Sequence, residues 1–435
     1  MNVFLTMLGC RLNQGEIDVM ARQFAAQGHT IAEAPEKADV IVVNTCAVTA
    51  EAARSSRQTI YRAGRANPEA QIVVTGCYAH IAPDAIRTLP GVAHVIDNLA
   101  KESLASIVTG QTLDTPAGFD QEPIAREASP VAGARTRAFV KVQDGCDQHC
   151  TFCVTRLARG VGRSRPLAAI VDEVRALGAA GYREIVLTGV HLGSYGHDQG
   201  QADGLYHLLR AILDETDMPR VRLSSLEPWG IPAGFFRLWA NPRLCRHLHL
   251  PLQSGCDATL RRMARRTSQA AFRAVVDEAR AHIPDVALTT DVIVGFPGET
   301  DAEFAISRAF VELMDFAGMH VFRYSRRPGT AAARLPGQVD EAVKKSRAEA
   351  LQAIARRGEA AFAARFAGTT RPVLWEGVAG TTGQGFVNHG YTDNYLRVRH
   401  VTSAVLTNQI TATRLIAFDP QHGALHGELQ PAYAG

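Results

Sequence analysis

Three closely spaced cysteines are the residues of this sequence whose type and spacing most clearly indicate chemistry. Cys146, Cys150 and Cys153 lie in the segment DGCDQHCTFCVTRLARG. A loop with this spacing can turn three thiolates toward one point. Structural zinc needs four ligands, whereas a four-iron cluster held by three cysteines leaves one iron open for the amino and carboxylate groups of a methionine-derived ligand. The segment therefore predicts such a [4Fe-4S] cluster.

A second set of three cysteines is spread over the first eighty residues. Cys10, Cys46 and Cys77 each follow a predicted strand directly, in FLTMLGC, IVVNTC and IVVTGC, and each precedes a predicted helix. Parallel strands of an open sheet end at the same edge, where such sheets bind ligands. Helix N-termini favour thiolates and anionic groups. Three thiols in equivalent positions predict a second three-cysteine cluster, although a single one would most often be a packing residue.

The other two cysteines, Cys245 and Cys256, flank the apolar segment HLHLPLQSG and are interpreted as small buried hydrophobes. No Cys-x-x-Cys pair has a partner pair at the spacing of a zinc ribbon. Disulfides are not expected, because a chain this long does not need them and a reducing compartment disfavours them.

Length and composition are those of an ordinary soluble protein. The 435 residues allow two or three domains, and 46% of them are hydrophobic and 20% charged. Neither a long apolar run nor a secretory leader is visible, which predicts a cytoplasmic protein that does not associate with a membrane. The net charge is only +3. Local basic runs at 261–266 and 344–357 are either solvated helix faces or nucleic-acid contacts.

The N-terminal part repeats a strand and helix pattern, which predicts an open parallel α/β domain over residues 1–110. Expected strands are 3–8, 40–44 and 72–75, and expected helices are 14–27, 49–66 and 83–89. Residues 111–137 lack periodicity and carry turn formers, which is typical of a linker.

The alternation restarts in residues 138–366. Six strand-like segments, each followed by a helix-length segment, predict a partial (βα)6 barrel whose chemistry lies beyond the C-terminal ends of the strands. Residues 367–420 carry short alternating strands with glycine turns, which predict a small β-barrel of the kind that often holds nucleic acid. Residues 421–435 are expected to form a loose tail.

The C-x-x-x-C-x-x-C segment, with Phe152 before its last cysteine, resembles the signature of the radical S-adenosylmethionine (SAM) superfamily. Along nearly the whole chain, further motifs resemble the methylthiotransferase family: LGCRLNQGE, NTCAVT, VTGCYA, RGVGRSRP, LTGVHLGSYG, LSSLEP, HLPLQSG and VGFPGET. One departure is VTRLARG after Cys153, which lacks the proline and tyrosine that many relatives place there.

Within that family, the segment TGVHLGSYG is similar to the branch that acts on N6-threonylcarbamoyladenosine at position 37 of tRNA. The isopentenyladenosine branch more often has glutamine and asparagine there, and the branch that modifies an aspartate of a ribosomal protein has a serine-rich run. The resemblance therefore implies an enzyme that adds a methylthio group to carbon 2 of the adenine.

The resemblance also implies the cofactors and partners. Two [4Fe-4S] clusters and SAM are expected, with Cys146, Cys150 and Cys153 acting in SAM cleavage and the second cluster supplying a sulfur that another SAM methylates. The expected partners are the tRNA anticodon loop, a reducing electron donor and a sulfur source.

Further residues are expected to bind SAM because they match motifs of the superfamily: Phe152, Thr188, Gly189, Gln253, Ser254 and Gly295. Gly189 permits a close approach of the backbone to the ligand. The pair Gln253 and Ser254 is equally well explained as a hydrogen-bonded strand end, and Gly295 as a turn residue.

The C-terminal barrel resembles the TRAM module, an RNA-binding domain. Arg397 and Arg399 lie beside Tyr391 and Tyr395, a mixture suited to phosphate contacts and base stacking. The tyrosines are equally compatible with the interior of the small barrel. A protein of another class, a noncatalytic RNA-binding protein stabilised by iron–sulfur clusters, is disfavoured because a structural cluster has no reason to keep one iron open.

Overall fold

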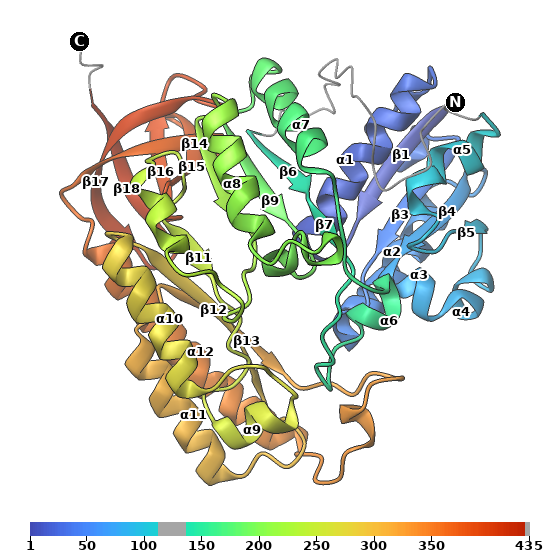
Figure 1. Ribbon diagram of the computed structural model, residues 1–435. Coiled ribbons are helices and arrows are strands. Elements are labelled where there is room, and N and C mark those ends of the chain that lie inside the picture. The colour runs from blue at the N-terminus through green and yellow to red at the C-terminus, as the bar shows by residue number, and fades with distance from the viewer. Residues whose placement is uncertain (112–135, 431–435) are drawn as a thin grey trace.

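The computed structural model describes residues 1–111 and 136–430, and the region predicted as a linker lies almost entirely outside them. Three regions follow one another along the chain: an N-terminal sheet, a central open barrel and a C-terminal closed barrel (Figure 1). This is the α/β architecture expected from the sequence. None of the helices in the described ranges is long and apolar enough to cross a membrane.

The N-terminal region is a parallel five-stranded sheet in the order β2-β1-β3-β4-β5. Its central strands are buried on both faces because helices cover the sheet from both sides. The strands are β1 (Asn2–Met7), β2 (Thr30–Ile31), β3 (Val40–Thr45), β4 (Gln71–Gly76) and β5 (Val92–Val95). The helices are α1 (Arg11–Ala26), α2 (Ala50–Ala66), α3 (Cys77–Ile81), α4 (Pro83–Arg87) and α5 (Leu104–Thr109).

Helix boundaries in this region follow local capping. Thr49 is the N-cap of α2, and its side chain accepts a hydrogen bond from the backbone N–H of Ala52. Helix α1 begins at Arg11, three residues earlier than the predicted range 14–27, so that it follows Cys10 directly. The two short strands β2 and β5 were not expected, since neither shows a clear alternation.

The central region contains six parallel strands in chain order, as predicted. Strands β6 (Arg137–Lys141), β9 (Glu184–Thr188) and β10 (Arg220–Leu223) form one sheet, and β11 (His247–His249), β12 (Ala287–Val294) and β13 (Gly318–Arg323) form another. Parallel bridges from Val221 to Leu244 and from Ser225 to His249 join the two. The result is an open half-barrel.

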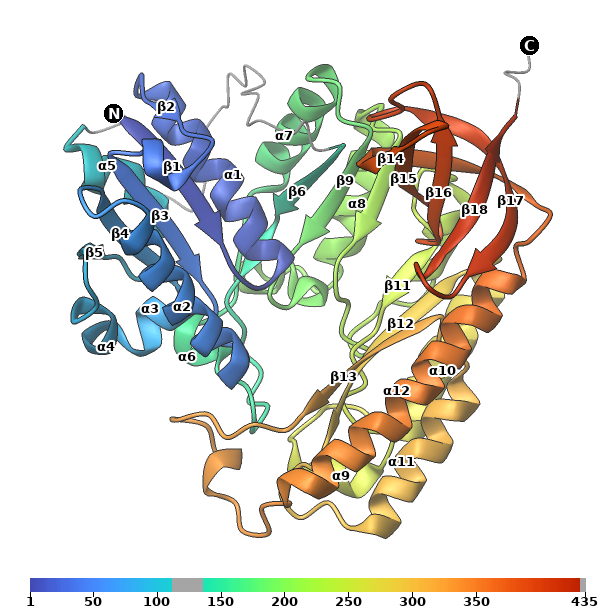
Figure 2. The same ribbon diagram turned by 180° about the vertical axis from the view of Figure 1, so that it is seen from behind.

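Helices cover the outer face of this half-barrel, where the largest hydrophobic core of the protein lies. In both views α10, α11 and α12 lie side by side on the outer side of β12 and β13 (Figures 1 and 2). The helices are α7 (Leu167–Ala179), α8 (Gly204–Glu215), α9 (Asp257–Arg262), α10 (Gln269–His282), α11 (Asp301–Met314) and α12 (Glu341–Ala364). Helix α11 carries a full capping box between Thr300 and Glu303.

The C-terminal region is a closed barrel in the order β14-β15-β16-β18-β17 around the buried Trp375. Its strands are β14 (Thr370–Thr382), β15 (Gly385–Thr392), β16 (Arg397–Thr402), β17 (Ile410–Asp419) and β18 (Ala424–Leu429).

The prediction that residues 421–435 form a loose tail is wrong for β18. This strand pairs with both β16 and β17 and closes the barrel. Its glycine is required by packing, because a Cβ at Gly427 would lie 2.7 Å from side-chain carbons of Thr413 and Val398. A short strand with a central glycine gives almost no signal of its own in the sequence.

The C-terminal barrel packs against the starts of the central strands through buried charges. Arg222 on β10 donates to Glu184 on β9 at 2.7 Å and to the backbone oxygen of Asp393 at 3.1 Å. Arg220 donates to the backbone oxygen of Pro372 at 2.7 Å. These contacts join β9 and β10 to the third region.

We expect Arg222→Met to destabilise the protein by about 3 kcal/mol, because it leaves the carboxylate of Glu184 buried with weaker compensation. Denaturant unfolding measures this loss. The matched control is Arg175→Met on the surface, where the pair with Asp172 is solvated and contributes at most about 1 kcal/mol. Equal effects of the two substitutions would contradict the structural role of Arg222.

Candidate iron–sulfur and substrate site

The loop that carries Cys146, Cys150 and Cys153 lies between two short antiparallel strands, β7 (Gln143–Asp144) and β8 (Arg163–Ser164), and includes α6 (Thr155–Arg159). It follows the first strand of the half-barrel. Gly145, with φ of +71°, makes the entry turn, because a Cβ there would lie 1.8 Å from the backbone oxygen of Val161. Glycine is therefore required at the entry of the loop.

Backbone N–H groups point at the sulfur atoms of this loop. The amide of Gln148 donates to the Sγ of Cys146 at 3.4 Å, and the amide of Thr155 donates to the Sγ of Cys153 at 3.3 Å. The pKa of Cys146 is raised to about 12, mainly by burial and to a smaller extent by the neighbouring thiols of Cys153 and Cys150. Without metal the thiols of Cys146 and Cys150 stay protonated at neutral pH, so that metal binding must release protons.

The cation Arg265 lies beside this loop. Arg265 donates to the Sγ of Cys150 at 3.8 Å and to Glu227 at 2.6 Å, and its guanidinium lies over the ring of Trp229 at 4.3 Å. Burial raises the pKa of Cys150, and Arg265 opposes that shift. The arginine therefore favours negative charge on the sulfur atoms.

The second set of cysteines lies along one edge of the N-terminal sheet. Cys10, Cys46 and Cys77 follow β1, β3 and β4, which are adjacent strands, and Cys10 and Cys77 also begin helices α1 and α3. Burial raises the pKa of Cys46 to about 11, and Cys10 and Cys77 add to the shift. A Cβ at Gly9 would lie 2.7 Å from the Sγ of Cys46, so glycine keeps this space open.

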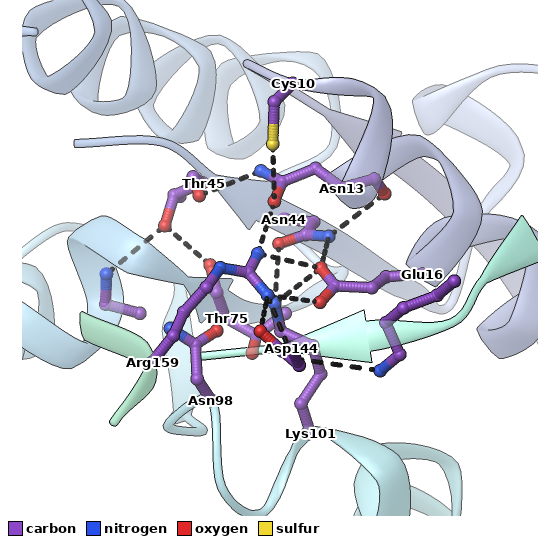
Figure 3. A network of polar contacts seen from close by, with 12 residues as sticks. Cys10, Asn13, Glu16, Asn44, Thr45, Thr75, Asn98, Lys101, Asp144 and Arg159 are labelled. Atoms are coloured by element: carbon purple, nitrogen blue, oxygen red, sulfur yellow. Dashed lines mark hydrogen bonds and ion pairs between the residues drawn. The ribbon is translucent and has the colours of Figure 1, made fainter. Parts of the chain in front are cut away.

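A buried polar network joins the two cysteine sets (Figure 3). Arg159, at the end of α6, donates to Glu16 on α1 at 2.8 Å and to Asp144 on β7 at 3.0 Å. Its other nitrogen donates at 2.8 Å to the Oδ1 of Asn13, which also accepts from the Sγ of Cys10 at 3.8 Å. The loop of the first set is thus bound to the helix that starts at the second.

The charges of this network balance one another. Lys101 donates to Glu16 at 2.7 Å, and the Nζ of Lys141 lies 3.9 Å from Asp144 and 3.6 Å from Glu102, so three cations face three carboxylates. Burial raises the pKa of Glu16, but Arg159 and Lys101 outweigh it and hold that pKa well below its usual range. Glu16 therefore stays ionised inside the protein.

A cavity of about 970 Å³ connects the regions of the protein. Cys10, Cys46 and Cys77 line one end, inner faces of the half-barrel line its walls, and Tyr391 and Tyr395 line the other end. This volume is at the upper end of the range of small-ligand sites. A ligand of nucleotide size in the cavity can reach the thiols of the second set.

The residues expected to bind SAM fall into two groups. Thr188 and Gly189 line the cavity at the end of β9. Phe152 is buried against Phe296, with ring centroids 6.4 Å apart, in a small apolar cluster. It does not appear in the lining of the cavity among the described residues.

The other three expected SAM residues occupy turns. The backbone of Gln253 has φ of +74° and bonds to Asp291 and Ile293 of β12, and the Oγ of the buried Ser254 accepts from the amide of Cys256 at 3.3 Å. This is the hydrogen-bonded strand end that the sequence also allowed. Gly295 has φ of +69° and donates to Glu299 at 2.6 Å, which is its turn interpretation. Contacts of these residues with SAM stay predictions.

The tyrosines expected to contact RNA lie at the interface of the two barrels. Tyr391 and Tyr395 stack on each other at 4.9 Å, Tyr395 stacks on His247 at 4.6 Å, and the guanidinium of Arg137 lies over both tyrosine rings. They face the cavity and do not fill the interior of the small barrel. Arg397 also lines the cavity, whereas Arg399 is half-buried on β16.

The two basic runs are partly internal. Arg262 pairs with Glu303 at 2.6 Å, and Arg347 is buried and donates to Glu299 at 2.8 Å. Lys344 is buried as well. Neither run is therefore a uniformly solvated helix face or a free basic surface.

Several site residues were missed in the sequence. Arg159, Glu16 and Lys101 carry the network, and their signal was weak because isolated charges in amphipathic segments usually face solvent. Arg327 follows β13 and donates to the backbone oxygen of Phe152 at 2.9 Å. Burial lowers the pKa of Arg327, and Cys153, Tyr324 and Cys46 oppose that shift.

Comparison with known proteins first defines the class. Residues 140–311 match the model of the radical SAM superfamily, and residues 2–97 match the model described as uncharacterized protein family UPF0004. The fold is similar to that of the radical SAM methyltransferase TsrM from Kitasatospora setae, with a TM-score of 0.58 over 76% of this chain and 77% of that one at 17% identity. The central region has a radical SAM fold.

Relatives over nearly the full length define the family. The chain is 37% identical to threonylcarbamoyladenosine tRNA methylthiotransferase MtaB of Thermotoga maritima, covering 90% of this chain and 92% of that protein. It is 34% identical to tRNA-2-methylthio-N(6)-dimethylallyladenosine synthase of Maricaulis maris, covering 95% and 94%. It is 36% identical to ribosomal protein uS12 methylthiotransferase RimO of Roseiflexus castenholzii, covering 87% and 85%.

The chain belongs to the radical SAM methylthiotransferase family. It is an enzyme that transfers a sulfur-containing group, and membership implies SAM and a [4Fe-4S] cluster.

The network around Glu16 leads us to expect that the stability of the protein depends on pH. The pKa of Glu16 is lowered in the folded protein, so its contribution to stability is complete above about pH 4.3, the unfolded value, and is lost as the pH falls from there through the folded pKa. We expect Glu16→Gln to cost about 3 kcal/mol at pH 7. The difference from the unsubstituted protein should shrink below pH 4.

Denaturant unfolding of both proteins between pH 7 and pH 3 measures this difference. Glu36→Gln on the exposed 3-10 turn is the control and should show no such pH-dependent difference. The free energies of unfolding of Glu16→Gln and of the unsubstituted protein should not differ by the same amount at every pH. A difference that stays constant down to pH 3 would contradict an ionised Glu16 in the network.

Proposed function

We propose that this enzyme adds a methylthio group to carbon 2 of N6-threonylcarbamoyladenosine at position 37 of tRNA. The observation that carries the proposal is the cavity that leads from the end of the C-terminal barrel, through the half-barrel, to Cys10, Cys46 and Cys77. Two relatives at 36% and 37% identity are named threonylcarbamoyladenosine tRNA methylthiotransferase, which supports this branch of the family.

In this proposal Cys146, Cys150 and Cys153 hold the cluster that binds SAM, and Cys10, Cys46 and Cys77 hold a second [4Fe-4S] cluster. When bound, the two clusters and SAM supply a radical that removes hydrogen from an unactivated carbon, and the sulfur that replaces it. The protein positions these groups and the substrate.

The donor sets fit clusters better than single ions. In the described ranges no group of three or more Cys, His, Asp or Glu side chains is arranged around a single metal ion. In a cluster each thiolate binds a different iron, so the sulfur atoms need not converge on one point. Arg159 beside one set and Arg265 beside the other favour the negative charge of such clusters.

The same proposal gives roles to the remaining predicted residues. The backbone of Thr188 and Gly189 meets the SAM amino group at the end of β9, with Phe152, Gln253, Ser254 and Gly295 around it. Tyr391, Tyr395, Arg397 and Arg399 contact the anticodon loop. An unpaired loop base enters the cavity at a smaller unstacking cost than a paired one. The electron donor and sulfur source act with the enzyme in the cytoplasm.

Two other targets belong to the same family, isopentenyladenosine in tRNA and an aspartate of a ribosomal protein. A noncatalytic RNA-binding protein held together by its clusters is disfavoured by the cavity, because a purely structural cluster needs no access for a ligand of nucleotide size. Cleavage of SAM by the purified protein separates this last class from the others.

The first experiment is a nucleoside digest of total tRNA from a strain that lacks this gene, with and without its restoration, analysed by mass spectrometry. We expect the methylthio form of threonylcarbamoyladenosine alone to disappear and to return on restoration. Unchanged tRNA would exclude the proposed substrate and direct the search to ribosomal proteins.

Cysteine substitutions separate the roles of the two sets. We expect Cys46→Ser to abolish methylthiolation and to remove roughly half of the iron while SAM cleavage continues, because only the second cluster is lost. Cys150→Ser should abolish both reactions. Cys256→Ser is the control, since Cys256 is buried apart from both sets and its loss should leave iron content and product unchanged. Loss of SAM cleavage in Cys46→Ser would contradict two separate clusters.

A further inference from the structure

The inner wall of the half-barrel carries a group of polar side chains on three adjacent strands. His249 lies beside Thr289 in the register of β11 and β12, and Asp291 lies beside His320 in the register of β12 and β13. All four line the cavity. Outer faces of the same strands are apolar and pack on helices, so this wall is not a continuation of the core.

Hydrogen bonds connect these side chains, and the tautomers of the two histidines set which atom of each pair donates. The Nε2 of His249 lies 3.3 Å from the carboxylate of Asp291, and its Nδ1 lies 2.9 Å from the Oγ1 of Thr289. With His249 neutral and donating to Asp291, its Nδ1 accepts from Thr289. The Nε2 of His247, at 3.1 Å from the same hydroxyl, then donates to Thr289. The chain ends at Asp291, beside His320.

This group opens onto the space between the two ends of the cavity. Asp291 is partly exposed and His320 is exposed, and the rings of His249 and His320 are 6.0 Å apart. Polar groups inside a protein are costly without partners. A ligand in the cavity meets an acceptor and two imidazoles that can donate or accept.

The wall is displaced from the second cysteine set in the direction of the C-terminal barrel. In an adenine, carbon 2 and carbon 6 flank N1, so the exocyclic bonds at these two carbons diverge from each other. A base that directs carbon 2 toward Cys10, Cys46 and Cys77 can therefore place its N6 substituent against another part of the cavity wall, such as the part formed by β11, β12 and β13.

We propose that His249, Asp291 and His320 bind the N6 substituent of the target adenosine and select a polar threonylcarbamoyl group over an apolar isopentenyl group. This inference rests on the proposed function and deepens it. Threonylcarbamoyl offers N–H and O–H donors to Asp291, and carbonyl and carboxylate oxygens to the imidazoles. An isopentenyl group makes none of these bonds and leaves the wall desolvated, and sites built on hydrogen bonds reject such analogues strongly.

The test measures binding of three labelled anticodon stem-loops that differ only at position 37: threonylcarbamoyladenosine, isopentenyladenosine and unmodified adenosine. Fluorescence anisotropy with the cluster-loaded protein gives the three affinities. We expect the threonylcarbamoyl loop to bind at least about tenfold more tightly than the other two. In Asp291→Leu combined with His320→Leu, the three loops should bind alike.

Two further variants keep this test independent of folding. Asp291→Asn preserves the shape of the side chain and should reduce the preference without changing cluster absorbance or the circular dichroism spectrum. His94→Leu, on the exposed edge strand β5, removes a histidine outside the cavity and should keep the full preference.

The outcomes separate the two proposals. Equal binding of the three loops by the unsubstituted protein, or an unchanged preference in the double variant, overturns the selecting role of the wall even when the digest shows the methylthio product. A preference that the double variant loses, together with a digest that shows no methylthio product, leaves the binding site standing and overturns the reaction.

Discussion

The rest of the structure depends on one buried set of ion pairs, in which Arg159 lies between Glu16 and Asp144 with Lys101 beside it. Separating the N-terminal sheet from the half-barrel would leave these charges buried without partners, which is strongly unfavourable. The network therefore fixes the position of the second cysteine set relative to the first. Close packing of α1 on β6 adds to this, because Gly15 approaches the backbone of Phe139 directly.

The common direction of the strands brings the functional loops together. In both the N-terminal sheet and the half-barrel the strands are parallel, so loops at their C-terminal ends gather at one edge of each unit. The half-barrel is open, and its inner face carries polar residues such as Thr289 and Asp291. The C-terminal barrel packs against the opposite ends of the strands and contributes Tyr391 and Tyr395 to the cavity.

Much of this could be predicted from local patterns. Apolar runs predicted the six central strands, and residue spacing identified three cysteines in one loop and three that each follow a strand. Pairing between distant segments could not be predicted: β18 was missed because its short glycine-containing sequence gains its stability from β16 and β17. The orientation of Tyr391 was undecided for a similar reason, since alternation in a strand does not say which neighbour each face meets.

The sequence by itself determined the class of this protein, because the spacing of Cys146, Cys150 and Cys153 and the position of three more cysteines after strands depend only on local chain geometry. Only the tertiary structure decided what lies between the two sets. Arg159 meets Glu16 across 143 residues, and His249 meets Asp291 across neighbouring strands. A buried charge is costly unless it is paired, and which charges are buried is known only from the folded chain.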